Sequence, residues 1–288
     1  MIRIYFFKRV WQWLMSLLLI VIVVLFFIGI LNKAIENKQS AQNAEHVDIK
    51  DHVKKENDSK HKKERQEKKN SNERKKNSKV YWGVDSASEV SKALYSCARE
   101  NYGKPQVWGR YLGDKEVSKG ITKNEASYLH DEGIKILLIY NHFQNATGYD
   151  NGKESAKQAL KFANEIDAPN TVAIFADIEP NYKVDSAFIQ GWYETLHQAK
   201  WNAGIYGDFS NKSKLSKALD GAEKNAKQHT ILWSAQPQTK ETSRKEAPDF
   251  KPDGMHDTKL YGWQYTIEAK NCEIDMNLFK QEMDESLW

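Results

Sequence analysis

The sequence predicts an α/β fold: an eight-stranded (β/α)8 TIM-like barrel in residues 80–288, irregular near its end, preceded by a transmembrane helix and a disordered tether. Three observations support this prediction. An uncharged apolar segment lies near the N-terminus, and a long lysine-rich polar stretch follows it. In the rest of the chain, eight short runs of β-forming residues alternate with helical stretches, which is the pattern of consecutive βα units.

The apolar segment, "VWQWLMSLLLIVIVVLFFIGIL", covers residues 10–31 and contains no charge. As a helix it would rise about 33 Å, enough to cross a bilayer core. Residues 1–9 hold three basic residues and no acidic one, which predicts a cytoplasmic N-terminus and an extracellular location for the chain after the segment. A cleaved signal peptide is the alternative, but "GILNKAIEN" offers no small-x-small cleavage site. We therefore expect an uncleaved signal anchor in the cell membrane.

Residues 32–79 contain few large apolar side chains and cannot bury enough surface to fold. They carry 15 Lys and Arg against 9 Asp and Glu, so the segment is predicted to be a disordered, positively charged linker. Its lysines could contact anionic lipid or an anionic wall polymer. Nucleic acid is the other usual partner of such runs, but we expect none outside the membrane. Residues 80–288 carry 25 Lys and Arg against 30 Asp and Glu, and are mildly acidic.

Eight runs are expected to form the strands: 80–86, 106–112, 134–141, 171–179, 202–209, 230–236, 260–266 and 273–279. Eight parallel βα units most naturally close into a barrel. An open doubly wound sheet is the alternative, but no glycine-rich phosphate loop follows the first run. Because residues 237–259 show no helical face, we expect the barrel to be irregular there.

Helix signals lie between the runs. Residues 122–133 open with Thr122 and Glu125 in capping-box spacing and end on a glycine. Residues 153–167 place their apolar side chains along one helical face, and Asp185 is expected to cap the next helix.

Cys97 and Cys272 are the only cysteines. An oxidising exterior would permit a disulfide between them, and the sequence leaves their pairing open. No Cys and His spacing resembles a metal site, so neither a metal nor a cofactor is expected.

Two carboxylates end the fourth run, in "IFADIEPN". Asp177 and Glu179 are two residues apart in a strand, so they share one face with Cα atoms about 6.6 Å apart. Paired carboxyl groups titrate apart, which provides the protonated acid and the anion that glycosidic cleavage needs. We expect Glu179 to be the general acid and Asp177 the stabilising anion or orienting partner.

A strand-end carboxylate can also simply cap a helix or pair with a lysine. Asp85 and Asp275 oppose that interpretation, because they lie on the first and last strands, which are neighbours in a closed barrel. All four carboxylates are therefore predicted to be catalytic. Metal binding ranks lower, because no histidine ends a strand.

Aromatic, amide and basic side chains also end the expected strands. Rings give flat apolar surfaces for sugars, and amides hydrogen-bond hydroxyl groups, although some of the rings could instead fill the barrel. The expected substrate-binding residues are Arg110, Tyr140, Tyr206, Trp233, Gln264, Tyr265 and Asn277.

Six motifs together, "YWGVDSAS", "FADIEP", "AGIYGDFS", "WSAQ", "YGWQYT" and "EIDMNLF", resemble those of the glycoside hydrolase family 25 lysozymes, the muramidases of peptidoglycan. The stretch from "VWGRYLGDKEV" to "LLIYNH" looks still closer to the related glycoside-hydrolase-like domain of unknown function, family 1906. The resemblance implies a β/α barrel, Glu179 as general acid, and Asp177, Asp85 and Asp275 as supporting acids. The sequence departs from the lysozymes in "SAS" after Asp85 and in Arg110 at the end of the second strand.

The predicted function is a membrane-anchored, extracytoplasmic glycoside hydrolase that acts on peptidoglycan or another cell-wall glycan. A linker of this length has a root-mean-square reach of about 40 Å, which places the barrel within a cell wall. The alternative is a non-catalytic glycan-binding or wall-organising module on a hydrolase scaffold. The presence of both Asp177 and Glu179 favours the enzyme, because a pure binder needs no proton donor.

Overall fold

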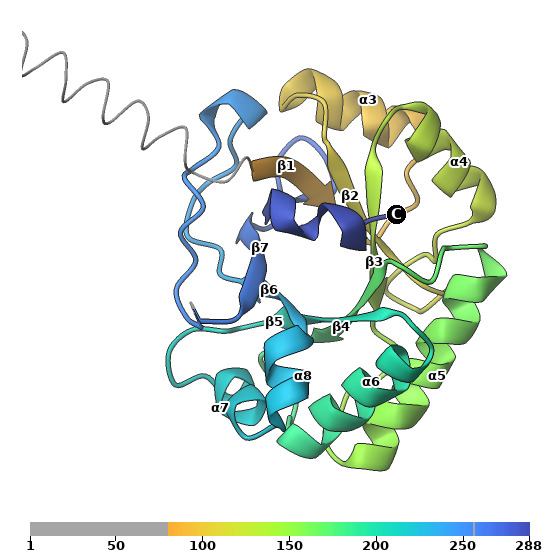
Figure 1. The fold of residues 1–288 in the computed structure, drawn as a ribbon. Coiled ribbons are helices and arrows are strands. Elements are labelled where there is room, and N and C mark those ends of the chain that lie inside the picture. The colour runs from red at the N-terminus through yellow and green to blue at the C-terminus, as the bar shows by residue number, and fades with distance from the viewer. Residues whose placement is uncertain (1–79, 256) are drawn as a thin grey trace, which may run out of the picture. The chain divides into compact units, whose positions relative to one another are not determined.

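The computed structural model describes residues 80–255 and 257–288, which form one closed barrel (Figure 1). The expected cytoplasmic tail 1–9, transmembrane anchor 10–31 and linker 32–79 lie outside the described residues. Within the described part of the chain, none of the helices combines the length and apolar character that a membrane span requires.

The barrel contains all eight expected strands in chain order, and each strand pairs with the next. The open doubly wound alternative is therefore wrong. The strands are β1 (Val80–Asp85), β2 (Val107–Tyr111), β3 (Lys135–Tyr140), β4 (Ala173–Ile178), β5 (Asn202–Gly207), β6 (Ile231–Ala235), β7 (Lys259–Thr266) and β8 (Asp275–Lys280).

The last strand corrects the expectation of eight parallel units. β1 to β7 pair in parallel, but β8 is antiparallel to both of its neighbours, β7 and β1. Only residues 267–274 join β7 to β8, and a parallel crossover needs about a dozen residues or more. The start of β8 therefore meets the end of β1, and Asp275 pairs with Asp85. We call this barrel end, formed by the ends of β1–β7 and the start of β8, the mouth.

Helices cover the barrel from β1 round to β6 (Figure 1). The connection from β6 to β7 has only the short 3-10 turn η1 (Arg244–Glu246) in its described residues, which confirms the expected irregularity. A second 3-10 turn, η2 (Gln281–Ser286), follows β8. The helices are α3 (Lys92–Asn101), α4 (Lys123–Asp131), α5 (Tyr149–Glu165), α6 (Ser186–Gln198), α7 (Lys214–Asp220) and α8 (Lys224–His229).

Two of the expected helix caps are present. The Thr122 side chain accepts a hydrogen bond from the main-chain N–H of Glu125, and Asp185 accepts one from that of Phe188. The capping box is incomplete, however. The Glu125 carboxylate does not turn back to Thr122; it accepts hydrogen bonds from Val90 N (2.8 Å) and Arg110 Nε (2.6 Å).

Alternate side chains of each strand enter two separate apolar cores. One core fills the barrel, and the other lies between the barrel and its helices. On β3, for example, Leu137 and Ile139 point into the barrel, whereas Leu138 and Tyr140 point toward the helices. This alternation decides which strand-end side chains can reach the mouth.

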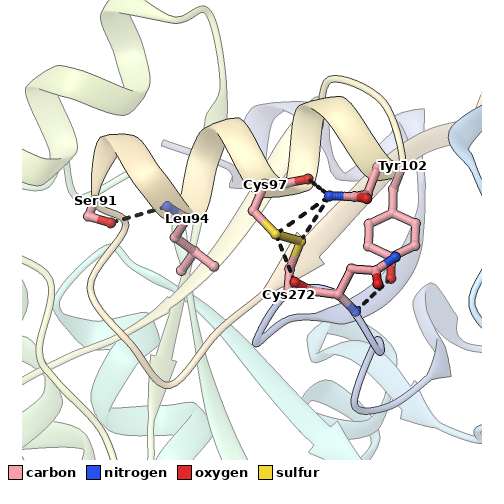
Figure 2. The surroundings of a disulfide bond; sticks show 7 residues. Ser91, Leu94, Cys97, Tyr102 and Cys272 are labelled. Atoms are coloured by element: carbon pink, nitrogen blue, oxygen red, sulfur yellow. Dashed lines mark hydrogen bonds between the residues drawn. A yellow bond between two sulfur atoms is a disulfide. The ribbon is translucent and has the colours of Figure 1, made fainter.

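A disulfide joins Cys97 on α3 to Cys272 in the β7–β8 loop, which answers the question that the sequence left open (Figure 2). The S–S distance is 2.04 Å and the Cα atoms are 6.0 Å apart, within the normal range. Next to the bond, Tyr102 Oη accepts a hydrogen bond from Asn271 N (3.2 Å). The loop is thus held to the end of α3 at two adjacent points.

Removing this disulfide is expected to lower the free energy of unfolding by about 2–5 kcal/mol, because it closes a long loop of the unfolded chain. Its sulfur atoms belong to residues 175 positions apart. Urea unfolding of the oxidised protein, the reduced protein and Cys97→Ala/Cys272→Ala measures the effect. The last two should share one lower midpoint; equal midpoints for all three would contradict the expectation.

Candidate active site

The structure brings four carboxylates together at the mouth. Asp85 ends β1, Asp275 begins β8, and Asp177 and Glu179 lie at the end of β4 and just beyond it. Asp85 and Asp177 are 4% and 5% exposed, while Glu179 and Asp275 are half-buried. Burying four carboxylates close together destabilises the folded state. Hydrogen bonds to the carboxylates and protonation of some of them reduce this cost.

Asp85 and Asp275 form the first carboxyl pair, and one amide connects them. Gln264 Nε2 donates to Oδ2 of each carboxylate, at 3.1 Å in both cases. Asn277 Nδ2 also donates to Asp85 Oδ2 (2.7 Å), and the main-chain N–H of Glu268 donates to Asp275 Oδ1 (2.7 Å). Burial, reinforced by the charge of Asp275, raises the pKa of Asp85 to about 7 even though these bonds oppose the shift.

Each amide is itself held by a donor on its carbonyl oxygen. The Tyr206 hydroxyl donates to Gln264 Oε1 (2.6 Å), and Trp233 Nε1 donates to Asn277 Oδ1 (2.9 Å). Their positions in the sequence predict that these four side chains bind substrate. The structure instead uses their polar atoms to hold the first carboxyl pair, and the Trp233 ring is buried against Phe175 inside the barrel.

Asp177 and Glu179 form the second pair. Burial is the main reason that the pKa of Asp177 is raised well above its usual range; the charges of Glu179 and Asp85 and a hydrogen bond with Glu179 add to the shift, and Lys115 opposes it. A raised pKa favours the protonated form of Asp177, whereas the sequence predicts Asp177 as the stabilising anion or orienting partner. Glu179 is the more exposed member, so it is the one that can reach a ligand.

Tyr111 belongs to the same cluster, although it is not among the substrate-binding residues expected from the sequence. It ends β2 and lines a cleft together with Asp85 and Asp275. Burial and the four carboxylates raise the pKa of Tyr111 well above its ordinary value, so its phenol remains a hydrogen-bond donor. Tyr111 shares the inner face of β2 with Gly109, where a Cβ atom would lie 2.7 Å from Asp85 Cβ.

The expectation that Arg110 lines the mouth is wrong, because its side chain points outward from β2. The guanidinium is buried between the barrel and α4, where Nε pairs with Glu125 at 2.6 Å. It also donates to the main-chain oxygens of Ser86 (2.6 Å) and Lys119 (3.0 Å). Arg110 thus fixes the loops that follow β1 and β2.

Tyr140 and Tyr265 also lie outside the mouth, because they too point to the outer core. The Tyr140 hydroxyl donates to Gln158 Oε1 on α5 (2.7 Å), and burial raises its pKa. The Tyr265 hydroxyl accepts a hydrogen bond from Trp82 Nε1 (2.9 Å), and its ring is fully buried. Neither ring presents a surface to a sugar.

Two clefts border the four carboxylates, one beside β1 and β8 and the other beside the ends of β4 and β5. A cleft of about 410 Å³ is lined by Asp85, Tyr111 and Asp275 and by the β7–β8 loop. A second, of about 280 Å³, is lined by Glu179 and by residues 208 and 212–215, which follow β5. Asp85 and Asp275 are therefore reachable from one cleft and Glu179 from the other, whereas Asp177 lines neither.

Two oxygens near the mouth have no hydrogen-bond donor within the described residues: Asp177 Oδ1 and Asn141 Oδ1, both buried. Asn141 follows β3 and lies two residues beyond Ile139. It therefore shares the face of Leu137 and Ile139, which point into the barrel. Among residues 80–255 and 257–288, no three His, Cys, Asp or Glu side chains converge to hold a metal ion.

Asp85→Asn is expected to make stability less dependent on pH. The folded-state pKa of Asp85, about 7, exceeds its ordinary value of 3.8. Binding of a proton by Asp85 therefore stabilises the folded state fully below the unfolded pKa. This stabilisation is lost as the pH rises through the folded pKa, and the free energy of unfolding falls by at most about 4 kcal/mol. Urea unfolding at pH 5 and at pH 8 measures the effect: between these two pH values the free energy of unfolding should fall less for Asp85→Asn than for wild type. Equal losses would contradict this, and Asp131→Asn, an exposed change on α4, is the control.

Comparisons with known proteins agree with this geometry. The family model "Rv2525c-like, glycoside hydrolase-like domain" matches residues 104–279. No curated protein matches the sequence.

Solved structures also match. An uncharacterized B. stearothermophilus protein is 35% identical, with a TM-score of 0.70, over 72% of this chain and all of that one. The spore cortex lytic enzyme SleM of Clostridium perfringens is 13% identical, with a TM-score of 0.50, over 71% of this chain and 68% of its own. The Tat-secreted protein Rv2525c of Mycobacterium tuberculosis, solved with L-tartrate, is 18% identical, with a TM-score of 0.47, over 68% of this chain and 94% of its own.

Proposed function

The chain belongs to the Rv2525c-like glycoside hydrolase-like domain family, and we propose that its barrel hydrolyses glycosidic bonds in peptidoglycan or another cell-wall glycan by carboxylate acid/base catalysis. One observation carries the proposal: two carboxyl pairs meet at one mouth, where Asp85 and Asp275 line one cleft and Glu179 lines another. The choice of a wall glycan rests on the motifs shared with the muramidases and on the predicted position outside the membrane.

The proposed proton donor is Glu179. It is the more exposed member of the pair and borders a cleft, whereas Asp177 is 5% exposed, so Glu179 is the carboxyl group that reaches the glycosidic oxygen. Protonation of the glycosidic oxygen releases the leaving sugar. Water then adds to the anomeric carbon, and its proton returns to the carboxyl pair.

The Asp85–Asp275 pair supplies the negative charge that faces the positive sugar ring of the transition state. It lies across the mouth from β4 and opens into the larger cleft. Tyr111 lines the same cleft with a protonated hydroxyl and donates to a sugar or carboxylate oxygen.

Residues 10–31 are proposed to anchor the protein in the cell membrane, with residues 1–9 in the cytoplasm and the barrel outside. The Cys97–Cys272 disulfide supports this location, since such bonds persist in oxidising compartments. Fractionation of intact cells followed by external protease is the test. Membrane-bound protein that loses its barrel to the protease supports the proposal; protected or soluble protein refutes it.

Incubation of residues 80–288 with purified peptidoglycan tests the activity. The B. stearothermophilus relative matches 72% of this chain over its entire length, so a barrel of this family folds without further chain. New reducing ends and soluble muropeptides are the expected result. A folded barrel that pellets with the wall and cleaves nothing would instead identify a glycan-binding module.

A further inference from the structure

Resting on the proposed function, we propose that Tyr206 is a positioning residue that acts through Gln264. Its hydroxyl fixes the direction of the Gln264 carboxamide, whose NH2 group then holds Asp85 and Asp275 together as one unit facing the larger cleft. Tyr206 therefore serves the reaction without touching the sugar.

A carboxamide has a donor end and an acceptor end, and rotation by half a turn exchanges them. Here the donor end faces two carboxylates, with Gln264 Nε2 at 3.1 Å from each. In the reversed orientation, the amide oxygen would face the two carboxylates and their charges would repel it. The 2.6 Å bond from the Tyr206 hydroxyl to Gln264 Oε1 favours the productive orientation.

Tyr206 keeps its proton in this position. It is the residue before the last one of β5, opposite Asp177 in the parallel register, and it is half-buried, with its ring centroid 4.5 Å from that of Trp233. Burial and the charges of Asp177 and Asp85 raise the pKa of Tyr206 well above its ordinary value. The hydroxyl therefore remains a donor over the whole range in which the carboxylates titrate.

The fold supplies a matched control. Tyr140 ends a strand and also donates its hydroxyl to a glutamine oxygen, Gln158 Oε1, at 2.7 Å. That bond lies in the outer core and touches none of the four carboxylates. Tyr140→Phe thus removes the same kind of hydrogen bond as Tyr206→Phe, but away from the mouth.

The experiment is a carbon-13 NMR titration of the side-chain carboxyls in residues 80–288, with the Asp85 signal assigned by its loss in Asp85→Asn. In wild type, Asp85 should titrate near pH 7. Tyr206→Phe and Gln264→Met should both raise this midpoint by about one pH unit, because a bond to the ionised carboxylate weakens or disappears. Tyr140→Phe should leave it unchanged.

An unchanged midpoint in Tyr206→Phe, or an equal shift in Tyr140→Phe, would overturn the proposal. If Tyr206→Phe fails to fold, the titration of Gln264→Met tests whether the Gln264 carboxamide holds Asp85. An unchanged Asp85 midpoint in that variant would overturn the proposal. The acid limb of kcat against pH for glycan cleavage should move with the midpoint in both mouth variants. If wild type cleaves no glycan, the proposed function fails, while the titration still judges the role of Tyr206.

Discussion

Glu179→Gln is expected to reduce glycan cleavage by the barrel about 10²–10⁴-fold, the usual contribution of a positioned proton donor. Glutamine keeps the size and the hydrogen-bonding oxygen of the side chain but cannot release a proton. Since Glu179 is half-exposed and borders a cleft, the change should leave the cores and the folding intact. Release of reducing ends from purified peptidoglycan is the measurement, and the circular dichroism spectrum and melting temperature check the fold.

Asp208→Asn is the matched control for that variant. Asp208 lines the same 280 Å³ cleft, and Ser210 N donates to its Oδ1 (2.8 Å), a bond that asparagine can also accept. Cleavage should fall by no more than a few-fold. Equal activity in Glu179→Gln and wild type would remove Glu179 from its role as general acid, and equal losses in both variants would indicate a general effect of charge.

Arg110→Met is expected to lower the free energy of unfolding by about 3–5 kcal/mol, the largest stability effect of any single change considered. The two side chains of the Arg110–Glu125 pair are 0% and 1% exposed, and Nε lies 2.6 Å from the carboxylate. Methionine fills similar volume but leaves the Glu125 charge buried without its partner. The Ser86 and Lys119 carbonyl oxygens lose a donor as well. Urea unfolding at pH 7 measures the loss.

A double-mutant cycle with Glu125→Gln separates the charge from the packing. Glutamine still accepts the hydrogen bond from Val90 N but carries no charge. The double variant should therefore be more stable than the sum of the two single losses predicts, by 1 kcal/mol or more, the usual size of coupling between residues in contact. Additive losses would show that the ion pair contributes no coupling, and Arg99→Met, an exposed change on α3, should alter little.

The barrel could be predicted because its signals are local. Eight apolar runs at suitable spacing predicted the eight strands, and the two-residue period placed Asp177 and Glu179 on one face. The same period places Arg110 and Tyr111 on opposite faces of β2, but only the structure shows that Tyr111 is on the inner face. The direction of β8 was also readable: the runs 260–266 and 273–279 are separated by too few residues for a parallel crossover.

The roles of individual polar groups could not be predicted in this way. Whether Gln264 binds a sugar or a carboxylate depends on side-chain distances across three strands, which no sequence pattern records. The raised pKa of Asp177 likewise depends on burial by neighbours distant in sequence. The pairing of Cys97 with Cys272 required α3 and the β7–β8 loop to be placed in space.

The pairing of β1 with β8 also bears on how an immobilised enzyme would meet an insoluble substrate. Val80 pairs with Lys280 at one barrel end, and Asp85 pairs with Asp275 at the other, about 17 Å away along β1. Val80, where the described residues begin, therefore lies at the barrel end opposite the four carboxylates. Residues 80–288 attached to a solid support through Val80 would present the mouth away from the support, so an insoluble polymer could pass across both clefts.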